Sequence, residues 1–341
     1  RQGVRDFVQK PWDNASVLSV VQALTAERQG RRREQRSRER EQAEAREIQR
    51  GLLPEALPQV AGWDLAAACV PAAAVGGDLY DVFALDDRTV AFMIADVAGK
   101  GVPAALLAAA VQASVRGSAK SGVRPSEVCA EVNRALCGHI PSNRFVTFFY
   151  GTLDTGSGVF TYTNAGHNPP LVAASQPAVG PGQPRSTSAH WAPGPDRRGQ
   201  PAEQWAPVSD RWAAFDRRAR ASSEWAPASA CRAEAAPPRG PAPALRLGCG
   251  GVMLGIDAGA RWRDQSVSIL PGDALLLYTD GLTEARSEAG EEFGEERLAS
   301  ALRSRAALPS DALVASLVEE VAGFGPVQED DRTLVVAQRT P

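Results

Sequence analysis

Four aspartates lie at the ends of short apolar segments, on corners of the chain that are rich in glycine. They are Asp78, Asp96, Asp280 and Asp330. A carboxylate at the end of a buried strand costs free energy unless a cation or a hydrogen-bond donor offsets its charge. Any one of these aspartates is typical of a turn or a cap, but four together favour a shared site. Because no histidine or cysteine has ligand spacing nearby, the pattern predicts oxygen ligands for a hard cation, Mg²⁺ or Mn²⁺.

Short buried strands and amphipathic helices must position these carboxylates. Unbroken or alternating apolar runs predict strands, and apolar residues at helical spacing predict helices. The expected strands are 89–95, 146–153, 158–163, 274–279 and 333–338. The expected helices are about 102–119, 126–138, 294–306 and 310–322. The segments 55–173 and 246–341 therefore have the patterning of an ordinary globular domain.

Length and charge limit the classes of protein to which the chain can belong. Its 341 residues suffice for one large or two modest domains. The net charge is −3, from 37 basic and 40 acidic residues, so no whole-chain field attracts nucleic acid or an anionic membrane. The five cysteines form no CxxC pair, and no apolar run is long enough to cross a bilayer. We therefore expect a cytoplasmic protein with no nucleic-acid or membrane partner.

Residues 1–26 have the pattern of the end of a larger domain. A strand is expected at 4–9, closed by Lys10-Pro11, and a helix follows it. This piece resembles the C-terminal end of a response-regulator receiver domain, in which a lysine followed by proline closes the last strand. An amphipathic N-terminal extension is the alternative.

The next segment, 27–54, is predicted to be a charged linker helix. Its first 24 residues hold nine arginines and six glutamates and no proline, at spacings that allow i,i+4 pairing. The interleaved acids and the lack of aromatic residues disfavour a nucleic-acid arm. A dimeric coiled coil is the alternative, although apolar a and d positions are nearly missing. The chain would then form a homodimer through this helix.

A segment of different composition, 174–244, interrupts the globular patterning. It holds 12 of the 25 prolines and four of the seven tryptophans, and the tripeptide WAP occurs in it three times. We expect a disordered insertion rich in proline, alanine, tryptophan and arginine. A docking segment anchored by its tryptophans is the alternative.

Seven short motifs follow one another in a fixed order along 45–341. They are AREIQRGLLP (45–54), GGDLYD (76–81), DVAGKG (96–101), NAGHNP (164–169), GGVMLGI (250–256), GDALLLYTDGLTEA (272–285) and DDRT (330–333). In this order they strongly resemble the bacterial protein serine phosphatases of the stage II sporulation protein E and stress-response type, within the metal-dependent, type 2C-like (PPM) family. The resemblance implies that 55–341, without the insertion, is one α+β phosphatase domain. Its fold would be an α-β-β-α sandwich of two antiparallel sheets flanked by helices.

The resemblance also implies a site for two cations, Mn²⁺ or Mg²⁺. The implied ligands are Asp78, Asp96, Asp280, Asp330 and the carbonyl of Val97, with Asp96 bridging both ions. Asp331 is the less favoured member of the Asp330-Asp331 pair, and Gly77, Gly99 and Gly281 are expected to let backbone approach the site closely. A hydroxide that bridges two cations can attack phosphorus in line, so no covalent enzyme intermediate is required.

Two further residues in the motifs are candidates for substrate binding or for structural support. His167 is a candidate general acid, but packing of its own turn is the favoured role. Lys100 stands just before the expected helix 102–119, where it could contact substrate phosphate or steady that helix. A solvent-exposed lysine at a turn is the alternative.

The predicted function is that of a phosphoserine or phosphothreonine phosphatase in signal transduction. The resemblance implies a phosphorylated anti-sigma-factor antagonist as the substrate, which links the reaction to sigma-factor regulation. The 1–26 segment implies an upstream receiver domain or sensor kinase. Two alternatives remain, a non-catalytic partner-binding module on a degenerate phosphatase fold and a small-molecule phosphoesterase, because specificity lies in the surrounding loops. The four retained aspartates disfavour the non-catalytic module.

Overall fold

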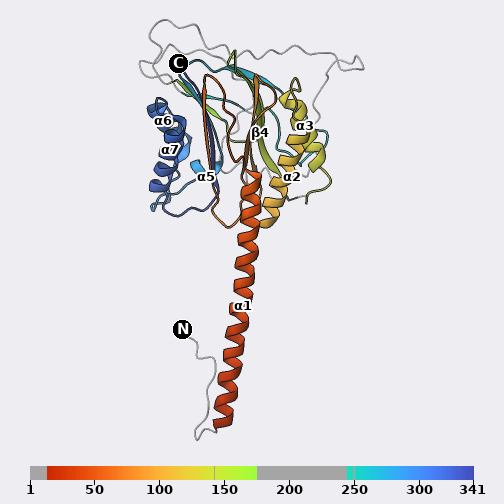
Figure 1. Ribbon diagram of the computed structural model, residues 1–341, viewed down its shortest axis with the longest axis vertical. Coiled ribbons are helices and arrows are strands. Elements are labelled where there is room, and N and C mark those ends of the chain that lie inside the picture. Colours follow the sequence, from red (N-terminus) through yellow and green to blue (C-terminus); the bar gives the residue numbers. More distant parts are fainter. Residues whose placement is uncertain (1–13, 142, 175–243, 249) are drawn as a thin grey trace. The chain divides into compact units, whose positions relative to one another are not determined.

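Two five-stranded antiparallel sheets form the centre of the computed structural model, which describes residues 14–174 and 244–341 apart from 142 and 249 (Figure 1). The first sheet has the order β1-β10-β9-β6-β7 and the second β2-β3-β4-β5-β8. The strands of the first sheet are β1 (Trp63–Val70), β10 (Arg332–Arg339), β9 (Asp273–Tyr278), β6 (Leu171–Ala174) and β7 (Leu245–Arg246). Those of the second are β2 (Leu79–Ala84), β3 (Thr89–Val97), β4 (Val146–Asp154), β5 (Val159–Ala165) and β8 (Gln265–Ser268).

Helices cover the outer face of each sheet (Figure 1). The helices are α2 (Val102–Ser118) and α3 (Pro125–Leu136) on the second sheet, and α5 (Asp280–Thr283), α6 (Gly294–Arg305) and α7 (Ser310–Phe324) on the first. Successive strand residues point to opposite faces. In β3, Phe92 and Ile94 therefore enter the core between the sheets, whereas Ala91 and Met93 pack toward α2 and α3. The structure thus confirms the α-β-β-α sandwich that the motifs implied.

The strands and helices predicted from apolar patterning are all present, with ends that differ by a few residues. Five strands have no counterpart in the prediction. They are β1, β2, β6, β7 and β8. The first reads WDLAAACV, in which alanines replace the branched residues that mark a strand, and the last three contain two to four residues each. Their pairing partners in the sheet, rather than their own composition, make them strands.

A single helix, α1 (Asn14–Leu52), runs across the predicted boundary between 26 and 27. Gly30 does not interrupt it. Exposed pairs at i,i+4 spacing support it, among them Glu27 with Arg31 and Gln35 with Glu39. The helix expected after Lys10-Pro11 and the predicted linker helix are therefore one continuous helix, which ends at Leu52.

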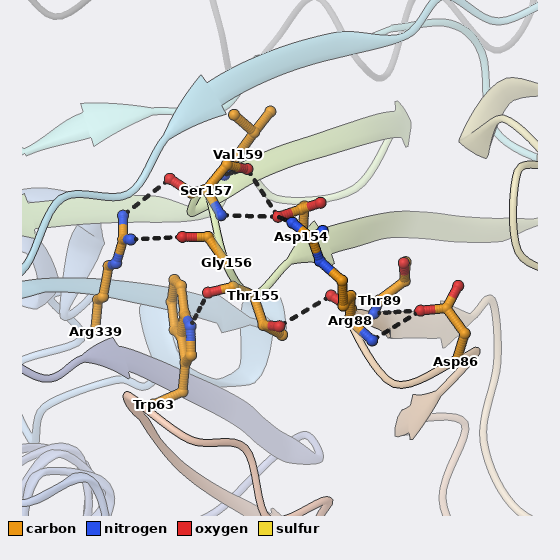
Figure 2. A network of polar contacts seen from close by, with 10 residues as sticks. All are labelled: Trp63, Asp86, Arg88, Thr89, Asp154, Thr155, Gly156, Ser157, Val159 and Arg339. Atoms are coloured by element: carbon orange, nitrogen blue, oxygen red, sulfur yellow. Dashed lines mark hydrogen bonds and ion pairs between the residues drawn. The ribbon is translucent and has the colours of Figure 1, made fainter.

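The turn between β4 and β5 ties the two sheets together at one end of the sandwich (Figure 2). The indole Nε1 of Trp63 in β1 donates a hydrogen bond to the carbonyl of Thr155 at 3.0 Å. The guanidinium of Arg339 in β10 donates to the carbonyls of Gly156 and Ser157 at 3.1 and 3.0 Å. Because Trp63 pairs with Arg339, this end lies opposite the end at which β10 begins.

Part of what the sequence predicted lies outside the described residues. This applies to the strand at 4–9 and to the insertion at 174–244, except for its two end residues. In the described part of the chain, no helix combines the length and the apolar character that a membrane span requires.

Candidate active site

In the second sheet, two of the predicted aspartates lie at the same end of neighbouring strands. Asp78 immediately precedes β2, and Asp96 is the penultimate residue of β3. Since Leu79 pairs with Ala95 in antiparallel register, Asp78 and Asp96 are brought next to each other. Both are largely buried, and burial, followed by the charge of Asp96, raises the pKa of Asp78.

The first sheet contributes the other two aspartates, which lie at the same end of the sandwich as Asp78 and Asp96. Asp280 opens α5 two residues after β9 ends, and Asp330 lies two residues before β10 begins. The side chain of Thr279, between β9 and α5, donates a hydrogen bond to Asp78 Oδ2 at 2.7 Å. This bond joins the acidic ends of the two sheets. The structure thus brings together all four aspartates that the sequence singled out. We call the end of the sandwich that carries Asp78, Asp96, Asp280 and Asp330 the acidic edge.

Burial, and then the charges of neighbouring carboxylates, raise the pKa of Asp78, Asp96 and Asp280. Burial, together with the charges of Asp280 and Asp330, raises the pKa of Asp96 to about 7. Burial, together with the charges of Glu284 and Asp330, raises the pKa of Asp280 to about 6. Burial, and then the charge of Asp96, raises the pKa of Asp78 well above its ordinary value. The described part of the folded chain therefore has too few basic side chains and hydrogen-bond donors here to offset the negative charge of these carboxylates.

The donor set fits a hard divalent cation. Carboxylate oxygens are the ligands that Mg²⁺ and Mn²⁺ prefer, and a cation would remove the mutual repulsion that the pKa shifts report. In the described residues, no three His, Cys, Asp or Glu side chains already converge on one point as a ligand cage. The carboxylates would therefore have to turn toward the ion that they bind.

The two members of the Asp330-Asp331 pair have different surroundings. Asp331 is buried, and its two oxygens accept hydrogen bonds from the backbone N–H groups of Ala72 and Gly77, both at 2.8 Å. Asp330 is about half exposed, and its Oδ2 lies 3.1 Å from Lys100 Nζ. Asp331 thus holds the loop before β2, whereas the carboxylate of Asp330 remains part of the acidic edge.

Two glycines let backbone pass closely at this edge. A Cβ added to Gly281 would lie 1.9 Å from the carbonyl oxygen of Asp331, and one added to Gly77 would lie 2.8 Å from the carbonyl oxygen of Val97. Real Cβ atoms do not come so close to backbone oxygen, so both positions require glycine. The Val97 carbonyl, the predicted backbone ligand, therefore lies directly against the loop that carries Asp78.

His167 is buried and both of its ring nitrogens have partners. Its Nδ1 is 2.8 Å from Thr147 Oγ1 and its Nε2 is 3.1 Å from the carbonyl oxygen of Tyr278. Burial lowers the pKa of His167 to about 4, and the hydrogen bond to the carbonyl opposes this only in part. The imidazole is therefore neutral at physiological pH. These contacts favour a role in packing the turn over a role as general acid.

Sequence reasoning missed one acidic residue at this edge. Glu284 follows Asp280 by four residues, close to one helical turn, and its charge raises the pKa of both Asp280 and Asp96. Burial raises the pKa of Glu284 itself. The i,i+4 spacing within the motif DGLTEA was the signal that could have identified it.

The fold is that of PP2C-type phosphatase domains. The SiaA-PP2C domain of Pseudomonas aeruginosa matches with a TM-score of 0.62 at 19% identity, over 89% of this chain and 97% of that one. The structure of the RsbU and RsbW domains of Rv1364c from Mycobacterium tuberculosis matches with a TM-score of 0.57 at 26% identity, over 83% of this chain and 62% of that one.

The sequence identifies the family. The profile described as Stage II sporulation protein E (SpoIIE) matches residues 86–185 and 242–340, and the chain belongs to this family. Among its relatives, Phosphoserine phosphatase RsbU of Bacillus subtilis (strain 168) is 35% identical over 125 residues. That match covers 37% of this chain and 37% of the relative, so the chain corresponds to little more than a third of that protein's length.

Proposed function

We propose that the chain is a metal-dependent protein phosphatase that hydrolyses phosphoserine or phosphothreonine on a regulatory protein. The observation that carries the proposal is the buried acidic edge, where Asp96 and Asp280 have raised pKa values that a cation would relieve. The similarity to Phosphoserine phosphatase RsbU supports the reaction class.

The chain's own residues have distinct tasks in this proposal. The residues that would hold two Mn²⁺ or Mg²⁺ ions are Asp78, Asp96, Asp280, Asp330 and the carbonyl of Val97. When bound, two such cations supply Lewis-acid activation of water for in-line attack on phosphorus. Asp96 would be the central one of these residues, because the charges of Asp280 and Asp330 act on it from the first sheet while Asp78 adjoins it in the second. Asp331 and Thr279 orient the loop and the carboxylate of Asp78.

The natural substrate and the arrangement of the chain are part of the proposal. An anti-sigma-factor antagonist is the substrate that the resemblance of the seven motifs implies. We assign the catalytic domain to 55–341, the insertion to 174–244, the linker helix to 27–54 and a receiver-like remnant to 1–26. An upstream receiver domain or sensor kinase, and a homodimer through the linker helix, would then supply regulation.

The test is hydrolysis of p-nitrophenyl phosphate and of a phosphoserine peptide by the full chain, in EDTA, Mg²⁺ and Mn²⁺. We expect cation-dependent turnover that falls more than about 100-fold in Asp280→Asn, since loss of even outer-shell partners of a metal costs 10–100-fold. Asp86→Asn, an exposed aspartate at the opposite end of β3, is the matched control and should leave turnover unchanged.

Two results would contradict the proposal, and a third would revise the role of His167. No turnover together with no calorimetric Mn²⁺ binding would reject the metal site and leave the non-catalytic binding module. Turnover of the small ester without turnover of the peptide would favour a small-molecule phosphoesterase. A pH–rate profile that changes in His167→Asn would show that the imidazole takes part in proton transfer, contrary to its assignment as packing.

A further inference from the structure

One basic side chain is paired with the acidic edge. The Lys100 ammonium lies 3.1 Å from Asp330 Oδ2 and donates a hydrogen bond to the carbonyl of Glu329 at 2.6 Å. The second carboxylate oxygen of Asp330 accepts the N–H of Asp331 at 3.0 Å. Both oxygens of Asp330 are therefore occupied by groups of the chain itself. Among the ion pairs of the described residues, this is the one that includes a predicted metal ligand.

The loop that carries Lys100 is held in place by its backbone. Arg144 donates a hydrogen bond to the carbonyl of Ala98, and its guanidinium fills the space where a side chain at Gly99 would lie. Gly99 has a φ of 107°, in the region that favours glycine, and α2 begins two residues after Lys100. The backbone thus places the base of the lysine beside the edge, while its side chain, 63% exposed, remains able to move.

We propose that Lys100 is a tethered counter-ion that holds Asp330 in the cation-free chain and competes with the divalent cation for this carboxylate. The inference rests on the proposed metal site. An ammonium on a four-carbon stem neutralises part of the negative charge at the edge without the ordered ligand geometry that Mg²⁺ or Mn²⁺ needs. The ammonium would have to leave Asp330 before that carboxylate could turn toward an ion.

The Lys100–Asp330 ion pair is weak enough for a cation to displace it, yet its loss should change cation affinity by a measurable amount. Lys100 and Asp330 are 63% and 47% exposed, and ion pairs at such exposure change an equilibrium by at most about fivefold. A displaced ammonium that stays about 6 Å from a divalent cation in water weakens the binding of that cation by roughly tenfold. The effect is smaller at higher salt. We therefore expect that removing the ammonium tightens cation binding by about three- to tenfold.

The experiment is Mn²⁺ titration calorimetry on the full chain at low salt, with Lys100→Met, Lys100→Arg and Lys120→Met. The charge-removing variant at 100 should bind Mn²⁺ about three- to tenfold more tightly than wild type. Lys100→Arg keeps the charge and should stay within about twofold of wild type. Lys120 is an exposed lysine for which the structure gives no ion pair with the acidic edge, so Lys120→Met should match wild type. Physiological salt should reduce the difference in Mn²⁺ affinity between Lys100→Met and wild type, since screening weakens interactions between exposed charges.

A second measurement without metal checks the same contact. In EDTA, loss of the counter-ion should lower the midpoint of thermal unfolding of Lys100→Met by about 1–3 °C and leave Lys120→Met unchanged. Unchanged or weaker Mn²⁺ binding by Lys100→Met would overturn the inference. If that result came with a raised KM and an unchanged kcat, it would assign the lysine to substrate phosphate instead. Wild-type chain that binds no Mn²⁺ would reject the proposed metal site itself, and with it this inference.

Discussion

Replacing Asp96 by asparagine should stabilise the metal-free chain at alkaline pH and remove most of its response to Mn²⁺. Asp96 is the carboxylate on which the charges of the acidic edge converge. Burial and the charges of its neighbours raise its pKa from 3.8 to about 7, so its charged form destabilises the folded state. Asparagine has nearly the same size and carries no charge, which removes this repulsion.

The size of the effect and its pH dependence follow from linkage. A pKa that rises from 3.8 to about 7 corresponds to about 4 kcal/mol at 1.36 kcal/mol per pH unit. The amide must still be hydrogen-bonded, so the expected net gain is about 2–4 kcal/mol. The folded state binds this proton more tightly than the unfolded state, so wild-type stability falls as pH rises from about 4 to about 7. The advantage of Asp96→Asn should therefore be absent near pH 4 and complete at pH 8.

Urea unfolding in EDTA at several pH values between 4 and 8 measures this directly. Asp86→Asn is the control with the opposite sign, because a hydrogen bond from Ser121 lowers the pKa of exposed Asp86 to about 2 and its charge stabilises the fold. Adding Mn²⁺ should stabilise wild type and change Asp96→Asn much less. If Asp96→Asn were no more stable than wild type at pH 8, or gained equally at pH 4 and pH 8, the electrostatic account of the site would be wrong.

Three other substitutions test separate parts of the structure. Gly281→Ala should cost about 3 kcal/mol or more and abolish cation-dependent turnover, because the new Cβ would meet the carbonyl of Asp331; a stable, active variant would contradict the close approach. Arg116→Met should lower the free energy of unfolding by about 2–3 kcal/mol, measured in urea, because it leaves the fully buried carboxylate of Asp81 without its bidentate partner. The cost is smaller than for a fully buried pair because Arg116 is half exposed to water. Trp63→Phe should cost about 1 kcal/mol through loss of one hydrogen bond at the end opposite the site, with turnover unchanged; altered turnover would show that the two ends are coupled (Figure 2).

Much of the fold was accessible from the sequence because it depends on local patterns. The helix at 102–118 and the strands at 89–97 and 273–278 carry strong apolar periodicity, which any tertiary context must bury. The strand at 63–70 was not accessible, because its alanines carry no strand signal and only pairing with β10 makes it a strand. The order of the motifs supplied the sandwich architecture, which periodicity alone does not specify.

The candidate site divides in the same way. The sequence by itself determined that Asp78, Asp96, Asp280 and Asp330 stand at strand ends, since an acid next to an apolar run is a local feature. It did not identify Glu284, whose contribution depends on its distance from carboxylates elsewhere in the chain.

Only the tertiary structure decided what neighbouring residues do. Asp330 and Asp331 are adjacent and chemically identical, yet one faces the acidic edge beside Lys100 and the other binds the backbone before β2. The pKa of Asp96 likewise depends on charges from two other segments of the chain, 280–284 and 330–331. Electrostatic coupling and hydrogen-bond partners are set by distances between segments that lie far apart in the sequence, and folding alone creates those distances.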